Sequence, residues 1–174
     1  MKRIGFVFIT LLLLSTGCTR PVSTALPDSS PTVGTALCAA SDLGTSSNSN
    51  GASGDVQIGV TLVNNSKSAC LVIGPPQVTL LAGGHALDVQ VIQTPPNQTP
   101  PAPAALTIAP GNSVIVILLW QNYCGPPPPD GVTVHLALTT DQALDIPLGI
   151  QGAPLCGSQG QPSTLTVAPY SFPP

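Results

Sequence analysis

Short stretches of alternating hydrophobic and polar residues recur along most of the chain. Residues 56–62 read VQIGVTL, and residues 132–138 read VTVHLAL. A period of two places successive side chains on opposite faces of a β-strand, so both stretches predict strands with one buried face. No stretch combines sustained helical spacing with capping residues at its ends. The pattern therefore predicts an all-β protein.

Further strands follow from short hydrophobic runs that end at turn-forming residues. Residues 113–120, SVIVILLW, are hydrophobic on both faces and predict a central strand, while Gly83-Gly84 predicts a hairpin turn. By composition, the serine- and asparagine-rich residues 44–54 predict a mobile loop. About 8–10 strands at this spacing favour an antiparallel β-sandwich. The remaining predicted strands lie at 72–73, 77–81, 86–92, 106–108, 144–148 and 164–167.

The composition favours strands and restricts which residue types can fill the core. Aromatic residues make up 3% and charged residues 6% of the 174 residues, whereas there are 21 prolines and 17 glycines. The volume of the core must therefore come from Val, Leu, Ile and Ala. A chain that is rich in β-branched and turn-forming residues favours strands connected by loops.

The N-terminus resembles a bacterial lipoprotein signal peptide. Lys2 and Arg3 precede a hydrophobic run at 4–14, and small residues lead to Cys18. The run is too short for a transmembrane helix, which needs about 20 apolar residues. Cleavage before Cys18 would leave its thiol to carry lipid. Ser15 stands where this signal usually has leucine, and the same run fits an ordinary secretion signal, so plain secretion is the alternative.

The signal divides the chain into three parts. Residues 1–17 are the predicted signal peptide, 18–35 a lipid-anchored flexible tether and 36–174 the β-sandwich domain. The tether is polar and interrupted by prolines. A second proline-rich stretch at 94–105 fits a crossover between sheets better than a polyproline ligand, because no basic residues flank it.

The charge of the exported part argues against nucleic-acid binding. After residues 1–17 are removed, Arg20 and Lys67 are the only fixed cations beside seven aspartates, and the chain has no glutamate. Nucleic-acid binding needs clustered Lys and Arg to neutralise phosphates. Adsorption to anionic lipid by charge is disfavoured for the same reason. The membrane attachment we expect is through lipid on Cys18.

Five cysteines leave four when Cys18 carries lipid. Cys38, Cys70, Cys124 and Cys156 allow three pairings, and an oxidising compartment favours disulfides over four unpaired thiols. None of the spacings is C-x-x-C, and no histidine lies near a cysteine at ligand spacing. Zinc is therefore not expected.

No set of residues points to catalysis. His85 falls in the predicted hairpin turn and His135 on the polar face of a predicted strand, so we expect both to face solvent. No G-x-S-x-G motif is present, and we assign no catalytic residue, metal ligand or cofactor. Trp120 and Tyr123 form an aromatic cluster, which fits packing in a sandwich or, alternatively, a platform for carbohydrate or peptide.

Cysteines and turns follow one another in a recognisable order along the chain. There is an early C-x-x-x-x-L at 38–43, the run VTLVNNSKSACLVIGPPQVTLL at 60–81, a turn at 109–111, the Trp120 strand with Cys124, and Cys156 before TLTVAPYSF. This order resembles an uncharacterised family, the domain of unknown function numbered four-two-three-two, which is common in exported proteins and lipoproteins of actinobacteria and similar bacteria. The resemblance covers roughly residues 37–172 and implies an immunoglobulin-like sandwich with Cys38–Cys70 and Cys124–Cys156 paired. It implies no activity.

These observations predict a location and a kind of function. We expect an extracytoplasmic, lipid-anchored lipoprotein that presents a non-catalytic domain and binds an envelope protein or polysaccharide. The alternative is a hydrolase or ligand-binding lipoprotein whose site lies in the proline-rich loops. The sequence does not give the oligomeric state.

Overall fold

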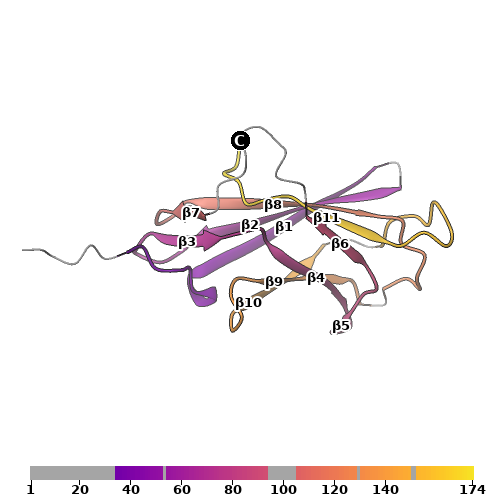
Figure 1. Ribbon diagram of the computed structural model, residues 1–174, viewed down its shortest axis with the longest axis horizontal. Coiled ribbons are helices and arrows are strands. Elements are labelled where there is room, and N and C mark those ends of the chain that lie inside the picture. The colour runs from indigo at the N-terminus through magenta and orange to yellow at the C-terminus, as the bar shows by residue number, and fades with distance from the viewer. Residues whose placement is uncertain (1–33, 53, 94–104, 129, 150–151) are drawn as a thin grey trace, which may run out of the picture. The chain divides into compact units, whose positions relative to one another are not determined.

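The computed structural model describes residues 34–52, 54–93, 105–128, 130–149 and 152–174. These residues form eleven strands and one 3₁₀ turn, η1 (Ala40–Asp42), which confirms the predicted all-β class (Figure 1). The strands are β1 (Leu43–Ala52), β2 (Asp55–Asn64), β3 (Cys70–Ile73), β4 (Gln77–Ala82), β5 (His85–Ala86), β6 (Gln90–Gln93), β7 (Ala105–Ile108), β8 (Ser113–Gln121), β9 (Val132–Ala137), β10 (Ala143–Leu148) and β11 (Thr164–Val167).

The strands form three sheets. One has five strands in the order β1-β2-β8-β11-β6, one has four in the order β10-β9-β4-β5, and β3 pairs with β7. The strands pair antiparallel except for β6 and β11, which run parallel. The immunoglobulin-like topology implied by the resemblance stays a prediction.

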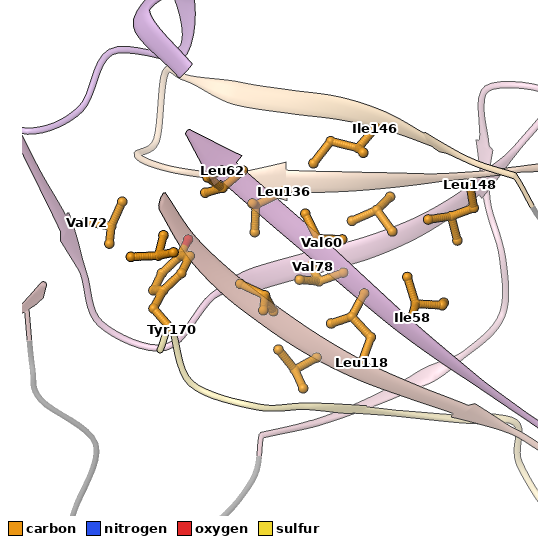
Figure 2. Packing of buried hydrophobic residues seen from close by; sticks show 14 of the residues in the cluster. Ile58, Val60, Leu62, Val72, Val78, Leu118, Leu136, Ile146, Leu148 and Tyr170 are labelled. Atoms are coloured by element: carbon orange, nitrogen blue, oxygen red, sulfur yellow. The ribbon is translucent and has the colours of Figure 1, made fainter. Parts of the chain in front are cut away.

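The two larger sheets bury their facing sides in one hydrophobic core. Alternate residues of β2, β8, β9 and β4 point into it, and Figure 2 shows their side chains between the strands. Trp120, at the end of β8, is fully buried. The core is largely aliphatic, as the composition predicts. Its largest fully buried members are Trp120, Ile58, Leu62, Leu80, Ile108, Leu118, Leu136, Ile146 and Leu165.

β1 corrects the prediction of a loop over 44–54. Its ten residues pair with the whole length of β2, from Leu43 opposite Asn64 to Ala52 opposite Asp55. Its polar composition fits an edge strand, because the backbone supplies the pairing. Along one side of the sandwich, the Ser47 hydroxyl donates to the Pro147 carbonyl of β10 at 2.8 Å.

The single strand predicted over 86–92 is divided between two sheets. His85 and Ala86 continue the hairpin opposite β4, and Gln90–Gln93 pairs with β11 in the other sheet. Leu87 N–H donates to Leu80 O at 2.9 Å, and the side chains of Leu87 and Val89 pack against the core. The chain crosses between sheets here because these hydrophobic side chains bury themselves on the way.

Asn64, the one polar residue fully buried among those the structure describes, fixes the end of β2. Its Nδ2 donates to Ser68 O and Ile108 O, both at 2.8 Å, and its Oδ1 accepts from Ser66 N–H and Oγ–H. These bonds satisfy the side chain and close the loop that leads to Cys70. The Cys38–Cys70 disulfide lies at this same end of the domain.

Several sequence predictions lie outside the described residues. They include the signal peptide at 1–17, Cys18 and most of the tether, and most of the proline-rich stretch at 94–105. Within the described residues, no helix is long and apolar enough to cross a membrane.

Candidate functional site

An open groove of about 580 Å³ lies where β2 begins and β8 ends. The tip of the β1–β2 hairpin forms one wall, and the loop 155–162 forms the other. Polar groups, chiefly hydroxyl, amide and backbone, and apolar groups share its surface about equally. The lining residues are Gly54, Asp55, Gln121, Asn122, Leu155, Cys156, Gly157, Ser158, Gln161, Pro162 and Thr164.

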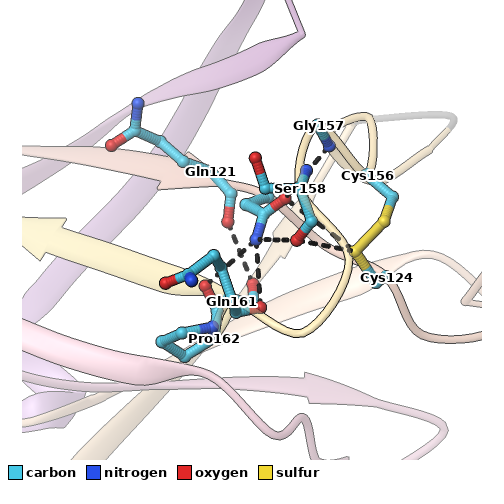
Figure 3. Close-up of a disulfide and its surroundings, with 9 residues drawn as sticks. Gln121, Cys124, Cys156, Gly157, Ser158, Gln161 and Pro162 are labelled. Atoms are coloured by element: carbon cyan, nitrogen blue, oxygen red, sulfur yellow. Dashed lines mark hydrogen bonds between the residues drawn. A yellow bond between two sulfur atoms is a disulfide. The ribbon is translucent and has the colours of Figure 1, made fainter.

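Asn122 organises the loop wall of this groove. Its Oδ1 accepts from Gly157 N–H at 3.0 Å and Ser158 N–H at 2.8 Å. Its Nδ2 lies 3.2, 3.0 and 3.3 Å from the carbonyl oxygens of Ser158, Gln161 and Pro162 (Figure 3). One side chain therefore holds the loop at several points along its length.

The backbone of Asn122 has a left-handed conformation with φ of 52°. Among the described residues it is the only non-glycine with positive φ. Asparagine is one of the few side chains that enter this region readily. The conformation turns the chain after β8, so that the carboxamide faces the loop.

A disulfide joins the two segments that Asn122 connects. Cys124 and Cys156, both exposed, are bonded, as Figure 3 shows. With Cys38–Cys70 this confirms the pairing implied by the resemblance. The loop wall is thus covalently fixed near Cys156 and hydrogen-bonded from Gly157 to Pro162, which makes it a preorganised surface.

Trp120 supports the groove from beneath. Its Nε1–H donates to Ser163 Oγ at 3.0 Å, and that hydroxyl donates to Gln121 O at 3.1 Å. The Tyr123 ring packs edge-on against the Trp120 ring, with 5.2 Å between centroids. Because Trp120 is fully buried, it has a packing role and provides no platform for a ligand.

Asp55 is the only ionisable side chain that lines the described groove. Gln121 Nε2 donates to its Oδ2 at 2.9 Å, across the pairing of β2 and β8. The remaining polar side chains are neutral. A neutral hydroxyl and amide surface with one carboxylate suits ligands rich in hydrogen-bonding groups rather than polyanions.

Leu155 forms a protruding rim beside the groove. Its side chain is 73% exposed, the highest value among the large hydrophobic residues of the described chain. Its N–H donates to Gly54 O at 3.0 Å, which holds it against the hairpin tip. A second open groove, of about 270 Å³, lies along Gly51, Val56 and Pro154 and also reaches Leu155. Leu155 therefore stands between two depressions.

The histidines named from the sequence lie away from this groove. His135 faces outward from β9, and its Nδ1 lies 2.7 Å from Asp145 Oδ1 on β10. His85 is exposed on β5, two strands further along the same sheet. The part of the chain that the structure describes brings together no group of three His, Cys, Asp or Glu residues suited to a metal ion.

The loop wall at 155–162 and the role of Asn122 in holding it were not predicted from the sequence. No sequence pattern identified Asn122, Ser158 or Leu155 as site residues. The available signal was an asparagine directly after a strand and two residues before a cysteine. Its partners could not be inferred, because they follow from how the loop folds back on β8.

The fold and site define a disulfide-linked all-β domain with a groove at one end. Residues 38–171 match the model of the family described as domain of unknown function (DUF4232), and the chain belongs to this family. No match was found among curated proteins, and none among solved structures.

Proposed function

We propose that this protein is a lipoprotein of the bacterial cell envelope, whose domain binds an envelope protein or polymer in the groove beside Leu155. The N-terminal signal and Cys18 support the location, and two disulfides suit an oxidising compartment. The domain is proposed to be non-catalytic.

One observation carries the binding role: an exposed Leu155 stands on a rim that is fixed before any partner arrives. A hydrophobic side chain that is exposed at a fixed position can be buried by a partner with little loss of conformational entropy. Around it, Ser158, Gln161 and Thr164 offer neutral hydrogen-bonding groups. This combination suits an extended peptide or glycan chain.

Site-specific photo-crosslinking in the native envelope tests this proposal. A photoreactive amino acid replaces Leu155 in one variant and Ile92, another exposed hydrophobic residue on β6, in the control. We expect a discrete adduct at position 155 that is absent at position 92 and is lost when Gln161→Ala is added. Identical adducts at both positions, or none at position 155, would contradict the proposal.

A hydrolase is the second candidate, and the His135–Asp145 pair is the observation that favours it. An imidazole oriented by a carboxylate through Nδ1 is the arrangement of a general base. Thr79 of β4 lies opposite His135 in the same sheet. If the protein hydrolyses esters or amides with His135 as the general base, His135→Ala should abolish that activity. Unchanged activity in His135→Ala would reject the hydrolase hypothesis.

A further inference from the structure

A patch of hydrophobic side chains lies around the Cys38–Cys70 disulfide. Leu37 is 49% and Ile73 55% exposed, and Leu71 and Leu138 are half-buried beside them. The four surround a small space of about 10 Å³ together with Thr139 and Tyr170, so they form one surface. We call Leu37, Leu71, Ile73 and Leu138 the root patch.

The root patch is held rigidly. Leu37 bridges Leu71 in parallel, Cys38 N–H donates to Leu71 O at 2.9 Å, and Leu71 N–H donates to Ala36 O at 2.9 Å. Leu71 and Ile73 are two residues apart on β3, so their side chains share a face. The disulfide fastens the first described segment to β3 beside this face.

The root patch and the groove lie toward opposite ends of β2. The groove is at Asp55, where β2 begins, whereas Asn65, just after β2 ends, donates through its N–H to Asp42 O. Asp42 ends η1, which begins two residues after Cys38. Ten residues of strand separate the two ends of β2, which corresponds to about 30 Å.

The N-terminal segment enters the domain at the root patch. The described chain begins at Gly34, three residues before Leu37, and Cys18 lies sixteen residues earlier. From its polar, proline-interrupted composition, a segment of this length is expected to span about 20–25 Å. A lipid on Cys18 would therefore keep the root patch close to the bilayer.

We propose that the root patch docks on the membrane surface, with Leu37 and Ile73 inserted among the lipid headgroups. This inference rests on the proposed lipid anchor. No side chain that is charged at neutral pH lines the patch in the described chain, since only Cys38, Val72, Thr139 and Tyr170 accompany its leucines and isoleucine. The contact is therefore apolar, and the anchor supplies the high local concentration that so few inserted side chains need.

Docking would orient the molecule. With the root patch on lipid, the groove and Leu155 lie at the end of β2 that faces away from the membrane. The domain would then present its binding surface to the envelope rather than sample all orientations on its tether.

Tryptophan quenching tests the contact. Ile73→Trp and, as the control, Leu155→Trp are introduced into the exported protein, which is reconstituted into vesicles of phosphatidylcholine and phosphatidylglycerol with brominated acyl chains. We expect quenching of the Trp at position 73 that is several-fold stronger than at position 155 and unchanged by salt. The parent protein supplies the baseline of the buried Trp120.

Three results would overturn the membrane contact. These are equal quenching at both positions, quenching lost in salt, or a blue shift at position 73 that grows with protein concentration without vesicles, which would identify a second copy as the occupant. The mass of the mature N-terminus tests the anchor separately. If Cys18 proves unmodified, coupling its thiol to a maleimide lipid still tests the root patch, since the other four cysteines are paired.

Discussion

Asn122 binds both sides of the peptide backbone at Ser158. Its Oδ1 accepts the Ser158 N–H at 2.8 Å, and its Nδ2 lies 3.2 Å from the Ser158 carbonyl oxygen. The carboxamide of Asn122 thus pairs with the backbone of Ser158, 36 residues later, through both the N–H and the C=O group. The loop beside the groove owes its conformation to this contact and to the neighbouring disulfide.

Replacing Asn122 by alanine is expected to destabilise the domain by about 2–3 kcal/mol, because several backbone groups lose their partner and alanine is strained at positive φ. Asn122→Gly removes the same bonds without the strain, so it should cost about 1 kcal/mol less. Urea unfolding of both variants separates the cost of the lost hydrogen bonds from the cost of backbone strain. Equal losses would show that φ at this position contributes nothing.

Asn64 is expected to contribute more to the free energy of unfolding than an exposed asparagine does. Asn64→Ala leaves Ile108 O, Ser68 O and Ser66 N–H without their partner at a largely buried position, which should cost about 2–4 kcal/mol. Asn50→Ala, on exposed β1, should stay within about 0.5 kcal/mol of the parent. Denaturant midpoints of the two variants decide this, and similar midpoints would be contrary to the expectation.

Tyr170 makes stability fall in alkaline solution. Burial raises its pKa from 10.0 to about 12. Below pH 10 both folded and unfolded chains keep the proton, so its contribution is fully present. Between pH 10 and 12 the unfolded chain loses the proton first, and the free energy of unfolding falls by about 1.4 kcal/mol per pH unit.

Tyr170→Phe tests this pH dependence. Between pH 10 and 12 the free energy of unfolding should fall less steeply in Tyr170→Phe than in the parent, and urea unfolding at each pH measures both. The same slope in both proteins would assign the alkaline loss to other groups.

The two disulfides should differ in how fast they are reduced. Each joins cysteines 32 residues apart, so the loop-entropy model gives both about 3–4 kcal/mol of stabilisation. Cys38 and Cys70 are buried, whereas Cys124 and Cys156 are exposed. Because a thiolate must reach a sulfur atom to attack it, mild reduction of the folded protein should open Cys124–Cys156 first.

Alkylation followed by peptide mass spectrometry identifies which cysteines are released. The control is reduction in denaturant, where the difference in access disappears and both bonds should open together. Earlier release of Cys38 and Cys70 in the folded protein would refute the expectation.

Alternating hydrophobic residues allowed β2 and β9 to be predicted, because each of them buries one face in the core. β8 was predicted instead from a run that is hydrophobic on both faces, and it lies in the middle of the five-stranded sheet. β1 could not be predicted in this way, since its LGTSSNSNGA sequence buries little and depends on backbone pairing with β2. The crossing between sheets near Leu87 was missed because the sequence ALDVQVI at 86–92 does not show which neighbouring strand each half will pair with.

The candidate site was still less predictable. The composition favoured strands and loops and the cysteines favoured disulfides, and the resemblance supplied their pairing. The groove depends on the left-handed backbone at Asn122 and on a loop folded against it. Nothing local in the Ser158 or Leu155 sequence specifies that arrangement, so only the assembled structure brings them together.

The parallel pairing of β6 with β11 has a consequence for the order in which the domain can fold. Thr164–Val167 lies between β8 and β6, so the five-stranded sheet is complete only when almost the whole chain is present. A chain that is synthesised from its N-terminus must keep Gln90–Gln93 without this neighbour until the last segment arrives. Folding is then limited by a late, long-range encounter, and a nascent or truncated chain that lacks β11 exposes an unpaired strand edge to aggregation.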